Sequence, residues 1–337
     1  MRILIAMSGG VDSAAAATLL KRAGHTVEGC TMRLAGTARE DAECERAAAS
    51  AKALGIPHRI LDLRDAFREA VISPFVAAYR AGKTPNPCIF CNAAIKFGAF
   101  YDYAMREGFD RIATGHYARI EGALLKKAAD PQKDQSYVLY RLSESILART
   151  LLPLGGITKA EARSIAEEAG LASARAEESQ DICFVPDGNY AALVEHLSGV
   201  PAAEGSYIDS EGHVLGKHRG IIHYTLGQHK GLGIALGRVR YVTHIDPIEN
   251  TVTLGDEADL YTAEATLTDL HFIGTPPSAP RRAAVKLRYR QREVACTVYP
   301  EGDTARLVLD TPQRAPTPGQ SAVLYDGDTV LGGGYIL

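Results

Sequence analysis

Residues 3–13 have the sequence Ile-Leu-Ile-Ala-Met-Ser-Gly-Gly-Val-Asp-Ser. The apolar run 3–7 predicts a buried parallel strand, and residues 14–22 predict a helix directly after the loop. Adjacent Gly9 and Gly10 let backbone N–H groups at a helix N-terminus approach an anion closely. Asp12 stands where a Walker loop ends on lysine, and a carboxylate beside phosphates suits a magnesium ion. The stretch therefore predicts a nucleotide site, in preference to an ordinary glycine-rich turn.

A loop of this kind holds pyrophosphate as a leaving group. It therefore indicates adenylation of a substrate by ATP rather than transfer of the terminal phosphoryl group. In this respect residues 8–13 resemble the loop of the PP-loop ATP pyrophosphatases.

Length and composition describe a globular protein of two or three domains, with 337 residues, 46% hydrophobic and 23% charged. No run approaches the apolar length of a membrane span, and Met1 leads directly into a predicted strand, so we expect a cytoplasmic protein without a signal peptide. A net charge of −3 requires any RNA contact to come from local basic patches. In a reducing compartment, the six cysteines favour redox, metal or nucleophilic chemistry over a disulfide scaffold.

The pattern of elements changes near residue 200. Before it, predicted strands at 3–7, 27–32, 58–63 and 111–114 alternate with predicted helices that include 42–54 and 159–169. This alternation predicts a doubly wound α/β fold on a mostly parallel sheet. After it, short strands are predicted at 205–209, 239–245, 251–254, 283–289, 294–299, 306–310 and 321–324. They indicate two small all-β modules, the last one a barrel, with 274–280 as a linker or long turn.

Two segments carry the informative cysteines. Residues 84–92, Thr-Pro-Asn-Pro-Cys-Ile-Phe-Cys-Asn, form a proline-stiffened loop before a helix predicted at 93–105, which would place Cys91 at a helix N-terminus that favours a thiolate. Residues 178–184, Glu-Ser-Gln-Asp-Ile-Cys-Phe, supply Cys183. One Cys-x-x-Cys pair does not complete a zinc site, and the alternative is a pair of small buried residues. Cys30, Cys44 and Cys296 lie in apolar patterns and are predicted to be structural.

The order of motifs is more specific than any one of them. SGGVDS, TPNPCIFCNAAIKF, ATGHYARI, KDQSYVLY, ESQDICF, GKHRGIIHYTLGQHKGLGIA and TPGQSAVLY follow one another along nearly the whole chain. In this order they resemble the tRNA-specific 2-thiouridylase family, bacterial enzymes that thiolate the wobble uridine of tRNA. The resemblance implies a PP-loop domain (adenine nucleotide α-hydrolase-like) over residues 1–198, a central β domain over 199–262 and a tRNA-binding β-barrel over 263–337.

The same resemblance implies the site residues. It places ATP, with Mg²⁺ on Asp12, at Ala6, Met7, Ser8, Gly9, Gly10, Val11, Asp12, Ser13, Met32 and Gly115. It makes Cys91 the nucleophile and Cys183 the carrier of a persulfide, with a disulfide between the two during turnover. It places tRNA at Asn86, Pro87, Cys88, His116, Lys133, Asp134, Gln135, Arg288, Tyr289 and Gln320.

The chain departs from the family pattern at Cys88, where an aspartate is frequent. Cys88, Cys91 and Cys183 then make three candidate thiolates, which resemble the ligands of a [4Fe-4S] cluster in iron–sulfur-dependent thiolases. We expect either a persulfide relay or such a cluster. A second departure is the shortened segment 33–36.

Residues 281–292 hold six cations and no acidic residue. Alternation along a strand would place Lys286, Arg288 and Arg290 on one face, which suits phosphate contacts; a solvated strand face is the alternative. A second basic, glycine-rich cluster, at 216–219 and 228–230, could equally be hairpin turns.

The function predicted from sequence is ATP-dependent 2-thiolation of the wobble uridine U34. The expected partners are tRNAs with Lys, Glu and Gln anticodons and a sulfur-donor protein fed by a cysteine desulfurase. The alternatives are another PP-loop ligase, such as a lysidine or argininosuccinate synthetase, which needs no cysteines, and a non-catalytic RNA-binding protein.

Overall fold

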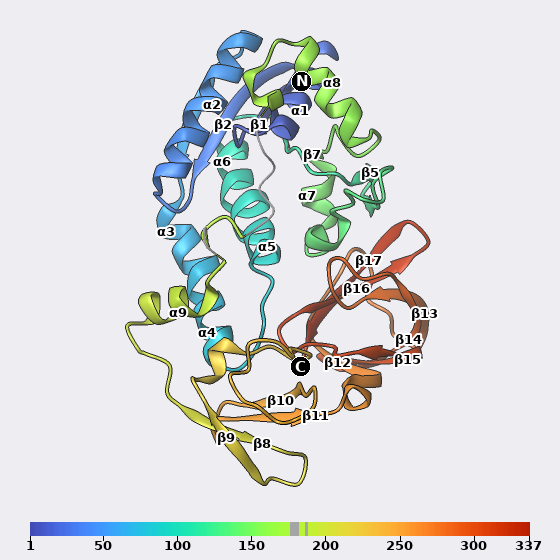
Figure 1. Cartoon of the computed structure of the whole chain (residues 1–337). Helices are drawn as coiled ribbons and strands as arrows, with labels where there is room; N and C mark the ends of the chain where they lie inside the picture. The colour runs from blue at the N-terminus through green and yellow to red at the C-terminus, as the bar shows by residue number, and fades with distance from the viewer. Residues whose placement is uncertain (176–181, 186–187) are drawn as a thin grey trace.

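The computed structural model describes residues 1–175, 182–185 and 188–337 (Figure 1). Five parallel strands form the first sheet in the order β3-β2-β1-β4-β7. Their bounds are Arg2–Ala6 (β1), Thr26–Arg33 (β2), His58–Asp62 (β3), Arg111–Ala113 (β4) and Thr150–Leu151 (β7). The predicted parallel, doubly wound sheet is confirmed. Strand β1 lies in its centre, so the loop after β1 opens at the carboxyl edge of the sheet.

Both faces of this sheet are covered. Ile3 and Ile5 of β1 pack with α1 (Val11–Arg22), α2 (Ala38–Leu54) and α8 (Lys159–Glu168). Leu4, which points to the opposite face, packs with Phe97, Phe100 and other residues of the long helix that carries the Cys-x-x-Cys pair. Burial on both faces explains why β1 is a continuous apolar run rather than an alternating one.

The Cys-x-x-Cys helix begins earlier than the sequence analysis predicted. It starts at Pro87, not at residue 93, and continues as α5 (Pro87–Phe90), the π-helix η2 (Cys91–Ala99) and α6 (Phe100–Arg106). Asn86 is its N-cap, because Asn86 Oδ1 accepts a hydrogen bond from the N–H of Cys88 at 3.1 Å. Proline at the first helical position adds to this start signal. Cys91 consequently lies in the second turn rather than at the helix N-terminus.

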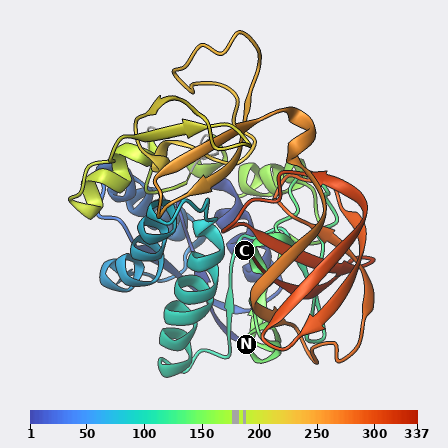
Figure 2. The same cartoon turned by 90° about the horizontal axis from the view of Figure 1, so that it is seen from below.

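Two β modules follow the sheet domain. The central one has the strand order β10-β11-β8-β9, with bounds Gly205–Ile208 (β8), Val214–His218 (β9), Tyr241–Asp246 (β10) and Thr251–Gly255 (β11). The last one is a closed antiparallel barrel, β12-β15-β14-β13-β16-β17, in which β12 also pairs with β17. Its bounds are Tyr261–Phe272 (β12), Arg281–Lys286 (β13), Val294–Glu301 (β14), Thr304–Arg314 (β15), Ser321–Asp326 (β16) and Thr329–Ile336 (β17). The central module lies below the sheet domain and the barrel at its lower right (Figure 1), and the view from below shows the two modules next to each other (Figure 2).

A hairpin from the first half of the chain extends the barrel sheet. Strands β5 (Arg119–Glu121) and β6 (Leu124–Lys126) pair with each other, and β6 pairs with β17 at Lys126 and Thr329. Beneath this contact Leu125, Val323 and Tyr325 share one core with Phe97 and Ile112. The barrel is therefore packed against the sheet domain rather than joined to it only by the chain.

The remaining helices are short. They are α3 (Arg64–Phe67), the π-helix η1 (Arg68–Ile72), α4 (Ser73–Arg80), α7 (Glu144–Ala148), α9 (Tyr190–Ser198) and the 3₁₀ turns η3 (Ser136–Leu139), η4 (Ala172–Arg175), η5 (Ile221–His223) and η6 (Glu257–Leu260). Within the described ranges, no helix combines the length and the apolar character needed to cross a membrane.

Candidate active site

The loop between β1 and α1 is held closed by its own serines. Ser13 Oγ accepts a hydrogen bond from the N–H of Ser8 at 3.2 Å and donates one to the carbonyl oxygen of Gly10 at 3.1 Å. Gly9 has φ +73°, and a Cβ there would collide with the carbonyl oxygen of Glu43 in α2. Gly10 is the N-cap of α1. The geometry fits the predicted anion site, because the first N–H groups of α1 face the loop.

Asp12 is engaged by two residues that the sequence analysis did not single out. Its Oδ1 accepts hydrogen bonds from Tyr117 Oη at 2.7 Å and from Lys159 Nζ at 2.6 Å. Lys159 is the first residue of α8, directly after the N-cap Thr158, whose capping box with Glu161 is complete. The lysine that the loop itself lacks therefore comes from another helix. The capping box was visible in the sequence, but nothing local linked it to residues 8–13.

Two successive residues connect the loop with the cysteines. Gly115 follows β4, and a Cβ on it would come within 2.9 Å of Ser13 N, so glycine permits its contact with the start of α1. The next residue, His116, is 8% exposed and lies with Nε2 3.4 Å from Lys96 Nζ. Lysine can only donate, so Nε2 accepts and Nδ1 carries the proton toward Thr114 Oγ1, 2.7 Å away. Burial, reinforced by Lys96, holds the pKa of His116 well below its usual range.

The three predicted thiols lie within electrostatic range of one another. Burial raises the pKa of Cys91 to about 12, Lys96 opposes this rise, and the Cys88 and Cys183 thiols add to it. Burial also raises the pKa of Cys88 and of Cys183, although both are exposed in part to solvent, and Lys96 lowers the pKa in each case. The expectation that a helix N-terminus makes Cys91 the readily ionised thiol therefore does not hold, because Cys91 is 8% exposed and lies beyond the first turn.

Lys96 owes its position to the π-helical segment η2. In an α-helix residues five apart point in different directions, whereas the wider π-turn brings residues i and i+5 to the same side. Cys91 and Lys96 are five apart, so the irregular turn places the cation beside the thiols. Residue spacing alone did not predict that Lys96 would lie beside the thiols, because no sequence pattern indicated a π-helical turn here.

Residues 83–86, which lead into the cysteine helix, are held by both β modules. Thr84 donates its N–H to Pro318 O at 2.9 Å and accepts at its carbonyl oxygen from Gln320 Nε2 at 2.7 Å. Thr84 Oγ1 also lies 3.2 Å from Thr225 Oγ1 of the central module. The side chain of Gln320, a predicted tRNA contact, is thus hydrogen-bonded to the residues just before the cysteine helix.

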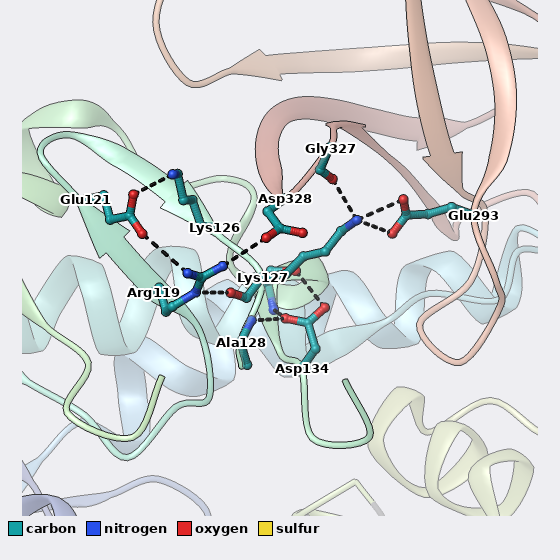
Figure 3. A network of polar contacts seen from close by, with 10 residues as sticks. Arg119, Glu121, Lys126, Lys127, Ala128, Asp134, Glu293, Gly327 and Asp328 are labelled. Atoms are coloured by element: carbon teal, nitrogen blue, oxygen red, sulfur yellow. Dashed lines mark hydrogen bonds and ion pairs between the residues drawn. The ribbon is translucent and has the colours of Figure 1, made fainter. Parts of the chain in front are cut away.

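In the predicted tRNA segment 133–135, Asp134 is buried, whereas Lys133 and Gln135 are half-buried; Figure 3 shows the contacts of Asp134. Asp134 is 9% exposed, and its carboxylate accepts from Ala128 N at 3.0 Å and from Ser136 Oγ at 2.9 Å. Gln135 Oε1 accepts from the N–H of Tyr117 at 2.9 Å. Lys127, next to Ala128, reaches across to Glu293 of the barrel at 2.7 Å. These contacts fasten the segment to the barrel and to the strand-end residues around Tyr117.

The basic strand is less free than its sequence suggested. β13 ends at Lys286 rather than at residue 289, and Lys286 Nζ lies 3.4 Å from Asp134 Oδ2. Arg288 donates to Ala315 O at 2.8 Å and to Thr317 Oγ1 at 2.6 Å, and burial lowers its pKa. Tyr289, 36% exposed, and Arg290 present surface to solvent. Lys286 and Arg288 therefore bond to partners that are distant in the sequence, which the alternating pattern of this strand does not reveal.

Other predicted residues have fixed places. Ala6 is the last residue of β1 and Met7 follows it. Met32 is half-buried in β2, and Val11 is buried at the start of α1. The segment Glu178-Ser179-Gln180-Asp181 lies outside the described residues. In residues 1–175, 182–185 and 188–337, no group of three or more His, Cys, Asp or Glu side chains is placed to hold a metal ion.

A central strand that ends in this glycine-rich loop, with a helix N-terminus behind it, defines a PP-loop ATP-utilising protein. The family described as "tRNA methyl transferase HUP domain" matches residues 1–187, and its PRC-barrel and aminomethyltransferase beta-barrel companions match 195–256 and 262–336. The chain belongs to the tRNA-specific 2-thiouridylase family. It is 45% identical to the tRNA-specific 2-thiouridylase of Acetivibrio thermocellus, over 99% of both chains. It is also 45% identical to that of Clostridioides difficile, over 99% of this chain and 98% of the relative.

Among solved structures, the U34-tRNA thiolase NcsA from Methanococcus maripaludis with its [4Fe-4S] cluster matches 59% of this chain and 65% of its own, with a TM-score of 0.38 and 17% identity. A likeness this weak carries no argument about the chemistry of this chain.

Proposed function

We propose that this protein catalyses ATP-dependent 2-thiolation of the wobble uridine U34 of tRNA. Full-length similarity to tRNA-specific 2-thiouridylases supports the reaction. The observation that carries it within the molecule is the Gly115–His116 pair. Gly115 lies against the nucleotide loop, and His116 contacts Lys96 beside the thiols. The residue that contacts the proposed activating site and the residue beside the proposed sulfur site are therefore neighbours in the sequence.

The activating half would adenylate the base. The uridine O2 attacks the α-phosphorus of ATP, the bond to pyrophosphate breaks, and the base is left as an O2-adenylate. Pyrophosphate would be received by the N–H groups of α1, with Lys159 as the nearby cation. Mg²⁺ that accompanies ATP would neutralise phosphate charge, and Asp12, a single carboxylate beside the phosphates, fits the usual way this ion is held.

The sulfur half would use two thiols. The terminal sulfur of a persulfide on Cys183 attacks C2 of the adenylated base, and AMP leaves with the former O2. The Cys91 thiolate then attacks the Sγ of Cys183, which forms the Cys91–Cys183 disulfide and releases the 2-thiouridine. An external reductant restores both thiols. All six cysteines are free thiols in this structure.

A [4Fe-4S] cluster on Cys88, Cys91 and Cys183 is the other predicted route. Three thiols are a suitable donor set for iron. Their placement does not fit it, because no described group of His, Cys, Asp and Glu is arranged as a metal site. We therefore derive no step through a cluster, and iron content is the measurement that decides.

Three of the proposed tRNA contacts, Tyr289, Asn86 and His116, lie near the thiols. Tyr289 of the barrel lies in electrostatic range of both Cys88 and Asp134, since each raises its pKa in addition to burial. Its ring is 5.9 Å from that of Tyr137, and Asn86 and His116 lie around the same thiols. The target base would leave the anticodon stack to enter between the barrel and the cysteine helix. The Lys, Glu and Gln anticodons, the sulfur-donor protein fed by a cysteine desulfurase and the cytoplasmic location remain predictions.

The test is a thiolation assay with ATP, unmodified tRNA and a persulfide donor. Cys91→Ser should lose 2-thiouridine, measured by mass spectrometry of nucleosides, while pyrophosphate release and tRNA binding persist. Cys44→Ala, a buried thiol on α2, is the matched control and should retain thiolation. Pyrophosphate release without any 2-thiouridine from the parent would favour a PP-loop ligase that needs no cysteine, and absence of pyrophosphate release from the parent would favour a non-catalytic RNA-binding protein. Full thiolation by Cys91→Ser would refute the role of Cys91.

A further inference from the structure

Tyr117 occupies an unusual place between two binding regions. It is 2% exposed, and its hydroxyl donates to Asp12 Oδ1 at 2.7 Å. Both backbone groups of Tyr117 bond to a single residue, Gln135. The N–H of Tyr117 donates to Gln135 Oε1 at 2.9 Å, and its carbonyl oxygen accepts from Gln135 N at 2.8 Å. The position of this phenol relative to Asp12 is therefore set by the segment around Gln135.

That segment is in turn fastened to the barrel. Asp134, the neighbour of Gln135, has an almost fully buried carboxylate, and the barrel residue Lys286 lies 3.4 Å from it. Lys127 adds contacts to Glu293 at 2.7 Å and to Gly327 O at 2.7 Å, and Figure 3 shows both reaching from the sheet domain into the barrel. Contacts thus run without interruption from β13 through residues 134 and 135 to Tyr117 and Asp12.

We propose that Tyr117 is a positioning residue that couples tRNA bound on the barrel to ATP bound on the nucleotide loop. The inference rests on the proposed function, which places tRNA on the barrel and ATP at Asp12. A tRNA that contacts Arg288 and Tyr289 fixes the barrel strand end beside Lys286, and hence the segment that holds Tyr117. Asp12 is then held in one orientation before ATP arrives. By linkage, ATP strengthens tRNA binding by the same factor by which tRNA strengthens ATP binding.

Coupling is measurable without turnover. ATP affinity would be determined by calorimetry with an analogue whose α–β bridge cannot be cleaved, with and without saturating unmodified tRNA. Coupling between sites is typically 5- to 150-fold, and we expect a tRNA-induced gain in the lower part of that range, roughly fivefold to tenfold. Tyr117→Phe keeps the ring and removes the bond to Asp12, so the gain should fall to about onefold while tRNA affinity without nucleotide stays at the parental value.

Tyr207→Phe is the matched control. Tyr207 is fully buried in the central module and donates to Leu232 O at 2.6 Å, so the variant loses a comparable hydrogen bond that is not part of the contacts between Lys286, Asp134, Gln135, Tyr117 and Asp12. It should keep the full coupling. A loss in both variants would show a general effect of destabilisation and overturn the inference.

A barrel-side variant tests the path. Lys286→Met should reduce coupling as Tyr117→Phe does, Lys286→Arg should restore it, and the Tyr117→Phe/Lys286→Met double variant should lose no more than either single one. A parent that binds both ligands without coupling, or a Tyr117→Phe variant with parental coupling, would overturn the inference and leave the proposed function standing. A parent that binds no ATP analogue or no tRNA would refute the proposed function itself.

Discussion

Replacing Lys96 with methionine should lower the reactivity of the active-site thiols. Among the described residues, Lys96 is the cation that lowers the pKa of Cys88, Cys91 and Cys183 alike, against the rise caused by burial. A thiol reacts as the anion, so removal of a positive charge that favours the anion raises the pKa and decreases the thiolate fraction. Methionine preserves the length and apolar part of the side chain.

The magnitude follows from the pKa of Cys91. With a value of about 12, about one Cys91 in ten thousand is ionised at about pH 8. A neighbouring opposite charge shifts a pKa by roughly one to three units, and each unit changes the thiolate fraction tenfold below the pKa. We therefore expect alkylation at about pH 8 to slow by at least about tenfold, and the pH–rate curve to move to higher pH.

Iodoacetamide followed by mass spectrometry of the separate cysteine peptides measures this effect without ATP, tRNA or a sulfur donor. Cys88 and Cys183 are the better reporters, because both are exposed whereas Cys91 is buried. Lys96→Arg should restore most of the rate. Lys52→Met, an exposed position on α2, should change nothing. Superimposable pH–rate curves for the parent and Lys96→Met would refute the electrostatic role.

Three further predictions concern the same site. Asp12→Asn should abolish pyrophosphate release with little loss of thermal stability, since the Asp12 side chain is 36% exposed and asparagine keeps an acceptor oxygen for Tyr117 and Lys159; parental release would contradict the assignment of the loop. Cys88→Ser should keep thiolation and contain no iron if the thiols act as a relay, whereas loss of activity together with iron from an anaerobically prepared parent would establish a cluster. Arg290→Gln should reduce the salt dependence of tRNA binding by about one unit of slope, because this exposed arginine can meet a phosphate; an unchanged slope would return it to the solvated surface.

Local signals predicted the nucleotide loop well. An apolar run, two glycines and an alanine-rich helix are adjacent in sequence, so their structure depends little on the rest of the chain. Even so, β1 ends at Ala6 and α1 begins at Val11, because Gly10 takes the N-cap position. The cysteine helix was predicted to begin too late, although Asn86 and Pro87 carried ordinary start signals.

Residues that act through distant partners were not predictable in the same way. Tyr117 and Lys159 meet at Asp12 from positions more than a hundred residues away along the chain. Lys286 appeared to be a free cation because its partner Asp134 lies in another module. Sequence patterning also gave no sign that β5 and β6 would join the barrel sheet. The predicted domain boundaries after residues 198 and 262 stay a prediction.

The pairing of β6 with β17 has a consequence for how the protein is made. A ribosome completes Phe97 and Leu125 long before Val323, Tyr325 and Val330, yet these residues share the core under the cysteine helix. The apolar surface of the cysteine helix that packs against the barrel therefore stays uncovered until almost the whole chain has left the ribosome. A prematurely terminated product would lack more than the barrel: its cysteine helix would have no finished support, and we expect such a product to be a substrate for proteolysis.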